Sequence, residues 1–171
     1  MRKLATGLAG VAGIAIGLAL GLSVQALAAS PHGGPSGTRT LVLVTRQQEL
    51  RVVDLPPSGL SQGDTRVFNF AVYDASNTRR IGRMDGVCHV TDLPDEASEA
   101  RIVAECMKTF ALSGGSITVQ GDATYTNLPD NFPFPAVQAI TGGTGTYRGA
   151  RGQVNLETRG GNLIQTMQLI P

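Results

Sequence analysis

Apolar and polar residues alternate along most of this chain in short runs, and this alternation is typical of β-strands. The clearest run spans residues 64–74, where Phe68, Phe70 and Val72 fall on one face and Asn69 falls on the other. Successive side chains of a strand point to opposite faces of a sheet, so a period of two predicts a strand with one buried face. No long stretch beyond the N-terminal region has the apolar period of a helix.

Runs of this kind recur with glycine, proline, asparagine or aspartate between them. They cover residues 40–45 with a possible continuation at 50–55, then 64–74, 80–90, 100–113, 116–121, 137–141, 147–158 and 163–170. The composition of residues 100–113 would also suit a helix, but the run leads straight into Gly114-Gly115, which is a hairpin signal and favours a strand.

About eight short strands without crossover helices predict an all-β fold, either an antiparallel barrel or a sandwich. Closure removes the exposed sheet edges, which favours an eight-stranded antiparallel barrel. The first and last strands then have to pair. Barrels of this size have an interior about large enough for one small ligand.

The N-terminal segment has the pattern of an export signal. Arg2 and Lys3 precede an uncharged apolar run that ends at Ala26-Leu27-Ala28, a small-x-small cleavage site. We therefore expect a signal peptide over residues 1–28, a flexible leader over 29–38 rich in glycine and proline, and one barrel domain over 39–171. An uncleaved membrane anchor is the alternative, because the run is long enough to span a bilayer.

Charge and composition narrow the partners. Loss of Arg2 and Lys3 with the signal peptide lowers the formal net charge from +1 to −1. A nucleic-acid binder needs clustered basic residues, so this balance argues against that class. The expected protein is secreted, without stable insertion in a membrane once the signal is removed.

The two cysteines, Cys88 and Cys106, have two interpretations. Disulfides persist outside the cytoplasm, and an even number of cysteines there suggests one bridge. If residues 81–90 and 101–112 form a hairpin, the two cysteines lie at equal distances from its centre and face each other, which permits a bridge. Otherwise Cys88 is a free thiol. Two cysteines and two scattered histidines do not make a metal site.

Four stretches in order resemble the allene oxide cyclase/dirigent superfamily. The strongest is residues 139–154 (AITGGTGTYRGARGQV), which resembles the family's short strand, Gly-rich turn, aromatic residue and Gly-rich strand. Residues 63–73 resemble its GD-x-x-x-F-x-x-x-x-Y pattern, residues 81–88 its next strand, and residues 115–121 its G-x-I-x-V-Q-G segment. The Gly-rich turn is not a phosphate loop, because it lacks a lysine and a following helix.

The resemblance implies an apolar interior that holds a hydrophobic small molecule without a cofactor. In the plant cyclases the cavity shapes a fatty-acid epoxide for cyclisation, and in dirigent proteins it orients phenoxy radicals for coupling; both depend on orientation. Cys88 falls at the position of the cyclase's pocket cysteine. The cyclase's first-strand glutamate is not matched, since Glu49 lies too far along. The position of its asparagine holds Phe70, with Asn69 on the opposite face.

Seven residues are candidates for the pocket lining: Phe68, Phe70, Val72, Tyr73, Cys88, Tyr147 and Arg151. Phe68, Phe70 and Val72 share one strand face, Tyr73 and Tyr147 are candidates for the pocket mouth, and an inward Arg151 would bind a carboxylate or phenolate. No Ser-His-Asp arrangement can be argued, and the catalytic residues are not identifiable from the sequence.

The sequence therefore predicts an exported barrel that binds an apolar small molecule and steers its cyclisation or stereoselective coupling, as a cofactor-independent isomerase or cyclase would. Whether it is an enzyme stays open. The alternatives are a non-catalytic carrier and a structural or envelope-associated protein on the same scaffold. Plant relatives form dimers or trimers, which makes a homo-oligomer plausible.

Overall fold

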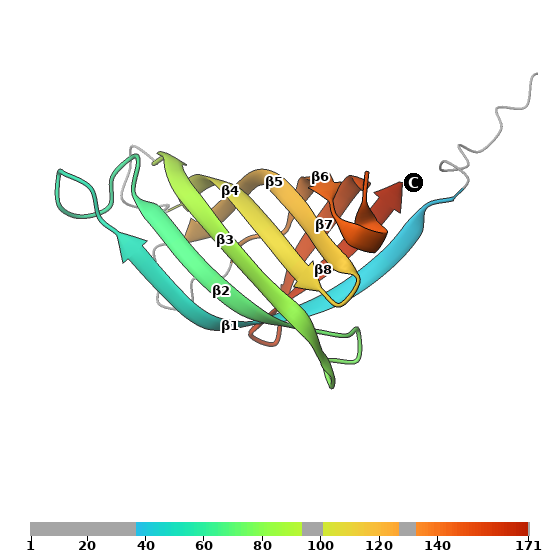
Figure 1. Ribbon diagram of the computed structural model, residues 1–171. Helices are drawn as coiled ribbons and strands as arrows, with labels where there is room; N and C mark the ends of the chain where they lie inside the picture. The colour runs from blue at the N-terminus through green and yellow to red at the C-terminus, as the bar shows by residue number, and fades with distance from the viewer. Residues whose placement is uncertain (1–36, 94–100, 127–132, 171) are drawn as a thin grey trace, which may run out of the picture. The chain divides into compact units, whose positions relative to one another are not determined.

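The protein is an eight-stranded, closed antiparallel β-barrel, as the sequence predicts (Figure 1). The computed structural model describes residues 37–93, 101–126 and 133–170. The predicted signal peptide and the leader up to residue 36 lie outside these ranges. No helix in the described ranges has the length and hydropathy needed to cross a bilayer.

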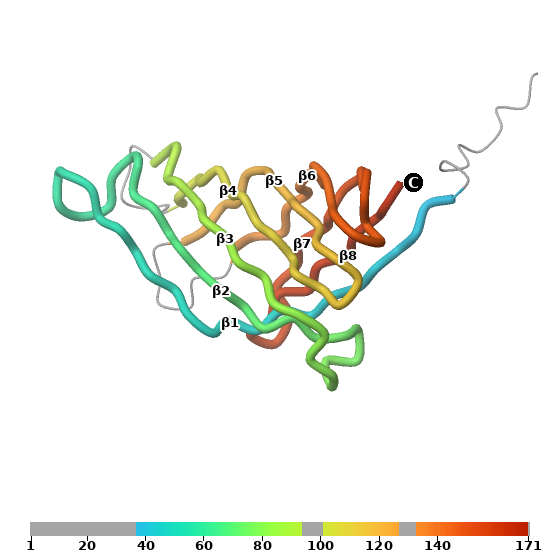
Figure 2. The backbone as a smooth tube through the Cα atoms, viewed as in Figure 1, coloured from blue at the N-terminus to red at the C-terminus, as the bar shows by residue number. Residues whose placement is uncertain are grey.

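Each strand pairs with its neighbours along the chain, and the tube in Figure 2 can be followed around the barrel from one to the next. The strands are β1 (Arg39–Val53), β2 (Thr65–Tyr73), β3 (Arg80–Asp92), β4 (Arg101–Leu112), β5 (Gly115–Thr126), β6 (Ala136–Gly143), β7 (Arg151–Arg159) and β8 (Asn162–Ile170). Strand β1 also pairs with β8, from Arg39 opposite Leu169 to Thr45 opposite Leu163. This last pairing closes the sheet.

One expectation about the strands is confirmed and another needs correction. The run at 40–45 does continue toward 50–55 as one strand, β1, because a bulge between Gln47 and Glu49 shifts its register against β2 and keeps the chain paired. The run at 147–158 begins later, since residues Gly145–Tyr147 form a 3-10 turn (η2) and β7 starts at Arg151. The strand interpretation of residues 100–113 is confirmed.

The interior follows from the alternation along each strand. In β4, for example, Ile102, Ala104, Cys106, Lys108 and Phe110 are all buried and face inward, while the residues between them are more exposed. This period of two is what separates the strand from the helix that its composition would allow. At the barrel end formed by the start of β1 and the end of β8, fully buried apolar side chains close the interior: Leu43, Val72, Phe110, Ile117, Val119, Val154 and Met167.

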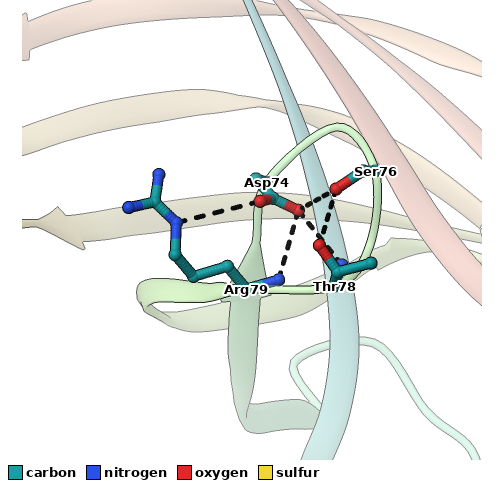
Figure 3. A network of polar contacts seen from close by, with 4 residues as sticks. All are labelled: Asp74, Ser76, Thr78 and Arg79. Carbon is teal, nitrogen blue, oxygen red and sulfur yellow. Dashed lines mark hydrogen bonds and ion pairs between the residues drawn. The ribbon is translucent and has the colours of Figure 1, made fainter.

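The turn between β2 and β3 is held by one carboxylate. Oδ1 of Asp74 accepts hydrogen bonds from the Ser76 hydroxyl at 2.8 Å and from the backbone N–H groups of Thr78 and Arg79 at 3.1 and 3.3 Å (Figure 3). These bonds, the one from Ser76 foremost, lower the pKa of Asp74. The arrangement lets Asn77 adopt a φ of 58° at the tip of the turn. Asp74 is therefore a turn residue.

Candidate functional site

A cavity lies inside the barrel and receives side chains from all eight strands. It reaches toward the barrel end at which Gln47, Leu50 and Pro133 lie. Its volume, counted as the space that the centres of water molecules can occupy, is about 40 Å³. This is enough for roughly three waters at 10–15 Å³ each. The lining is mostly apolar, and its polar members are Gln47, Arg66, Lys108, Tyr125 and Gln138.

The disulfide between Cys88 and Cys106 forms part of the cavity wall. The two residues pair directly across β3 and β4, with a Cα–Cα distance of 4.0 Å, and both side chains are buried. The predicted bridge is confirmed, and Cys88 is not a free thiol. Because opposite residues on paired strands share a face, both sulfur atoms face the interior.

Tyr125 places its hydroxyl beside this bridge. Its Oη lies 3.2 Å from Sγ of Cys88 and 3.5 Å from Sγ of Cys106, and the phenol is the donor because bridged sulfurs carry no proton. Burial raises the pKa of Tyr125 to about 12, although the nearby Arg66 opposes the rise. The Arg66 guanidinium stacks on the ring, 4.8 Å from its centroid. The site thus keeps a protonated phenol and a guanidinium together at the cavity.

Lys108 is the second cation of the cavity, and it lies deeper in the barrel. Its Nζ donates to Oε1 of Gln165 at 3.4 Å, and Nε2 of Gln165 donates to Oγ1 of Thr45 at 3.3 Å. Burial without a carboxylate partner lowers the pKa of Lys108 to about 7. At neutral pH a large share of this amine is therefore uncharged.

A strand glycine makes the room for this lysine. Gly86 lies between Phe68 on β2 and Lys108 on β4 in the strand register. A Cβ at position 86 would collide with the Phe68 ring and would lie 3.1 Å from Cγ of Lys108. The absence of a side chain at Gly86 therefore lets the ring and the lysine stem share the same part of the interior.

Gln138 carries an unused acceptor. Its Nε2 donates to the carbonyl oxygens of Gly121 and Asp122, at 3.1 and 2.9 Å, which fixes the orientation of the amide. Its Oε1 is buried and has no hydrogen-bond partner within the part of the chain that the structure describes. A buried acceptor without a partner is costly, so this atom is a natural contact for a ligand donor.

The structure places the seven candidate residues in different environments. Phe68, Phe70 and Cys88 line the cavity, with the two rings in an edge-to-face contact at 5.6 Å. Val72 is fully buried on the same face but belongs to the packed end of the barrel. These positions follow from the alternation along β2 and β3.

Three of the candidates do not lie at the cavity. Tyr73 follows the inward Val72 and so points outward, where the Arg46 guanidinium covers its ring at 4.1 Å. Arg151 lies on the outward face of β7, opposite in direction to the buried Val154, and is exposed. It donates a hydrogen bond to the Thr141 carbonyl at 3.3 Å. Tyr147 lies in the turn η2 at the opposite end of the barrel, half-buried.

The two residues compared with the cyclase's acid and amide also lie outside. Glu49 and Asn69 pair across β1 and β2, and Nδ2 of Asn69 donates to Oε2 of Glu49 at 3.2 Å on the outer surface. Glu49 also forms an ion pair with Arg51 at 2.7 Å. Neither group therefore lines the cavity, and no Asp or Glu from the described part of the chain is among its lining residues. Within the described ranges, no three His, Cys, Asp or Glu side chains gather as a metal site.

Comparison with solved structures gives barrels of the same fold. A pyocyanin demethylase matches with a TM-score of 0.62 and 20% identity, over 77% of this chain and 100% of the other. An exo-specific intermolecular Diels-Alderase matches with a TM-score of 0.54 and 15% identity, over 77% and 97% of the two chains. A pterocarpan synthase dirigent protein matches with a TM-score of 0.52 and 16% identity, over 83% and 96%. At these identities the likeness shows the fold alone.

The family itself is shown by sequence. The profile of the allene oxide cyclase barrel like domain matches residues 34–161, which include seven of the eight strands. The closed barrel and the order of its strands agree with that match. The chain belongs to the allene oxide cyclase barrel-like family.

Proposed function

We propose that the barrel binds a small molecule with an apolar body and a polar oxygen, and that it steers the cyclisation or stereoselective coupling of this molecule. The observation that carries the proposal is the set of polar side chains kept at the cavity: Arg66, Lys108, Tyr125 and Gln138. A carrier of apolar molecules has no need for these groups, whereas a catalyst uses a few fixed polar groups in an apolar cavity.

The chemistry proposed here depends on shape and charge. Apolar walls such as Phe68 and Phe70 hold the ligand body in one conformation, which lowers the entropic part of the barrier. Arg66, Lys108 in its charged form and the Tyr125 hydroxyl stabilise negative charge that develops on a ligand oxygen. These steps need no cofactor. The structural relatives named as a Diels-Alderase and as a dirigent protein are consistent with such a role, at the level of fold.

We also propose that the protein acts outside the cytoplasm. The support is the signal-like N-terminal segment together with the bridge between Cys88 and Cys106, because disulfides persist in oxidising compartments. Sequencing the N-terminus of protein recovered from the culture medium tests this. Recovery of unprocessed chain in the cytoplasm alone would contradict it.

The first test is native mass spectrometry of the purified protein after incubation with an extract of its own culture. A retained small molecule supports the proposal and supplies a substrate class for turnover assays. A bound molecule that is released unchanged, without turnover of its precursors, would instead favour the non-catalytic carrier.

A matched pair of variants ties binding to the cavity. Ala123 lines the cavity, and Thr124 next to it points outward on the same strand. Ala123→Leu should fill much of the space and reduce ligand retention at least tenfold, whereas Thr124→Leu should leave it unchanged. Equal retention by both variants would place the ligand elsewhere and overturn the proposal.

A further inference from the structure

Lysine is rare in this chain, which makes the buried one notable. The sequence has 14 Lys and Arg residues, of which the lysines are Lys3, in the predicted signal peptide, and Lys108. The other members of this set are arginines, which keep their charge under all ordinary conditions. The single lysine of the described chain is thus the one basic side chain whose amine can lose its proton, and it faces the cavity.

The surroundings of Lys108 leave its nitrogen available. In the described part of the chain its one hydrogen bond is the 3.4 Å contact with Oε1 of Gln165, and it forms no ion pair. The Phe68 ring and the Gly86 backbone lie beside its stem. Two of the three protons of a charged Nζ would therefore lack partners among the described residues, which disfavours the charged form.

Among the residues that the structure describes, no acid at the cavity restores the charge. Within the described ranges, the other charged or titratable side chains that line the cavity are Arg66 from β2 and Tyr125 from β5, and a guanidinium opposes a second positive charge. The inward residues of β3, β5 and β8 next to Lys108 are uncharged, among them Met84, Val119 and Gln165. Burial lowers the pKa of Lys108 to about 7, so free amine is present at neutral pH. A desolvated lysine of this kind is the usual form of an amine nucleophile.

We propose that Nζ of Lys108 captures small carbonyl compounds, aldehydes or unhindered ketones, as an imine inside the barrel. The amine nitrogen attacks the carbonyl carbon to give a carbinolamine, which loses one water molecule as the C=N bond forms. Water reverses the reaction and returns the free amine, so no oxidant or reductant is required. The inference rests on the proposed function, because it uses the same cavity and assigns the polar oxygen of the ligand to a carbonyl group.

The geometry limits the class of carbonyl compound. The cavity has about 40 Å³ of open room, and its apolar walls include Phe68, Phe70 and Met84. A short, unbranched apolar aldehyde fits this space, whereas a bulky ketone requires the walls to move. Propanal is therefore the probe of choice.

The experiment traps the imine. The mature protein is incubated with propanal and sodium cyanoborohydride, digested with an arginine-specific protease, and mapped by mass spectrometry. We expect one propyl group on Lys108, with a rate that saturates as propanal increases because binding in the cavity precedes the reaction. The N-terminal α-amine is the internal comparison, and its labelling should rise linearly with propanal.

Two variants separate a cavity reaction from chance labelling. Ala123→Leu should slow labelling of Lys108 at least tenfold and leave the α-amine unaffected, and Thr124→Leu should change neither. Lys108→Arg keeps a basic group but cannot form the imine, and Lys108→Met serves if the arginine variant does not fold. Both should lose saturable labelling entirely.

The outcomes distinguish this inference from the proposed function. Lys108 that stays unlabelled, or is labelled without saturation and equally in Ala123→Leu, overturns the inference. If the protein still retains a culture ligand in native mass spectrometry, the proposed function stands without the imine. If it retains no ligand and Lys108 is unlabelled, both fail.

Discussion

Replacing Lys108 by methionine should remove a pH dependence of stability that this one side chain creates. Methionine has nearly the length and volume of the lysine stem but no charge, so the packing beside Phe68 and Gly86 is preserved. The variant loses the hydrogen bond to Gln165 at every pH, which shifts its stability by a constant amount. Only the proton linkage changes with pH.

The sign and size follow from the two pKa values. Burial holds the pKa of Lys108 at about 7 in the folded chain, against about 10.4 in the unfolded chain. Between these values the unfolded chain binds more protons, so the free energy of unfolding rises with pH. At about 1.4 kcal/mol per pH unit, and with partial ionisation at pH 7, the wild type should gain about 2 kcal/mol between pH 7 and pH 9 relative to Lys108→Met. Below pH 6 the difference should level off.

Urea unfolding at several pH values between 6 and 9 measures this directly, with the difference between wild type and variant taken at each pH. Taking the difference cancels the titration of every group that the two proteins share. The intact disulfide favours two-state unfolding, which the calculation requires. An NMR titration of protein labelled at lysine gives the folded-state pKa independently, because the mature chain is expected to contain one lysine.

A difference that stays constant within about 0.5 kcal/mol from pH 7 to pH 9 would contradict a lowered pKa for Lys108, because the expected change is several times larger. It would mean that Lys108 keeps its charge in the folded barrel, by contact with water or an anion. Little free amine would then be present at neutral pH to form the imine.

Three other predictions concern the framework of the barrel. Replacing both Cys88 and Cys106 by alanine should lower the free energy of unfolding by about 3 kcal/mol, the value for a loop of 18 residues; urea midpoints that coincide for the oxidised wild type and the variant would count against this. Asp74→Asn should lower the thermal midpoint at pH 7. The loss should vanish as the pH falls through the depressed pKa of Asp74, because the carboxylate stabilises the fold only while it is ionised. A loss that persists at pH 2 would show that the charge is not responsible. Gly86→Ala should cost about 1–3 kcal/mol because the new methyl group meets the Phe68 ring; a neutral result would show that the ring moves aside freely.

The fold could be predicted from the sequence because local patterns determine it. Alternation marked the strands, glycine pairs marked the turns, and equal spacing about the hairpin centre placed Cys88 opposite Cys106. Alternation alone does not determine the limits of a strand where a bulge or a 3-10 turn intervenes, as at Gln47 in β1 and at Tyr147 before β7. Such local departures depend on how the neighbouring strands pair.

The polar part of the candidate site was missed, although a signal for it existed. Lys108 shares its parity with Cys106 and Phe110 along β4, and Arg66 shares its parity with Phe68 along β2. The same alternation that placed the phenylalanines inside therefore places both cations inside. Because charged residues are exposed in most proteins, parity alone is a weak signal for an inward cation. Which inward residues border open space depends on the packing of all eight strands, which no single segment specifies.

The pairing of β1 with β8 also determines how the chain can be shortened. The Thr45 hydroxyl donates a hydrogen bond to the Leu163 carbonyl, and the two residues are 118 positions apart. Both sides of β1 are therefore paired only when the last strand of the chain is present. A chain that stops before Asn162 would leave one unpaired side on β1 and another on β7. Such a fragment is an open sheet with two free edges, able to join other copies edge to edge. C-terminal truncation should therefore produce insoluble aggregates, and not merely a less stable monomer.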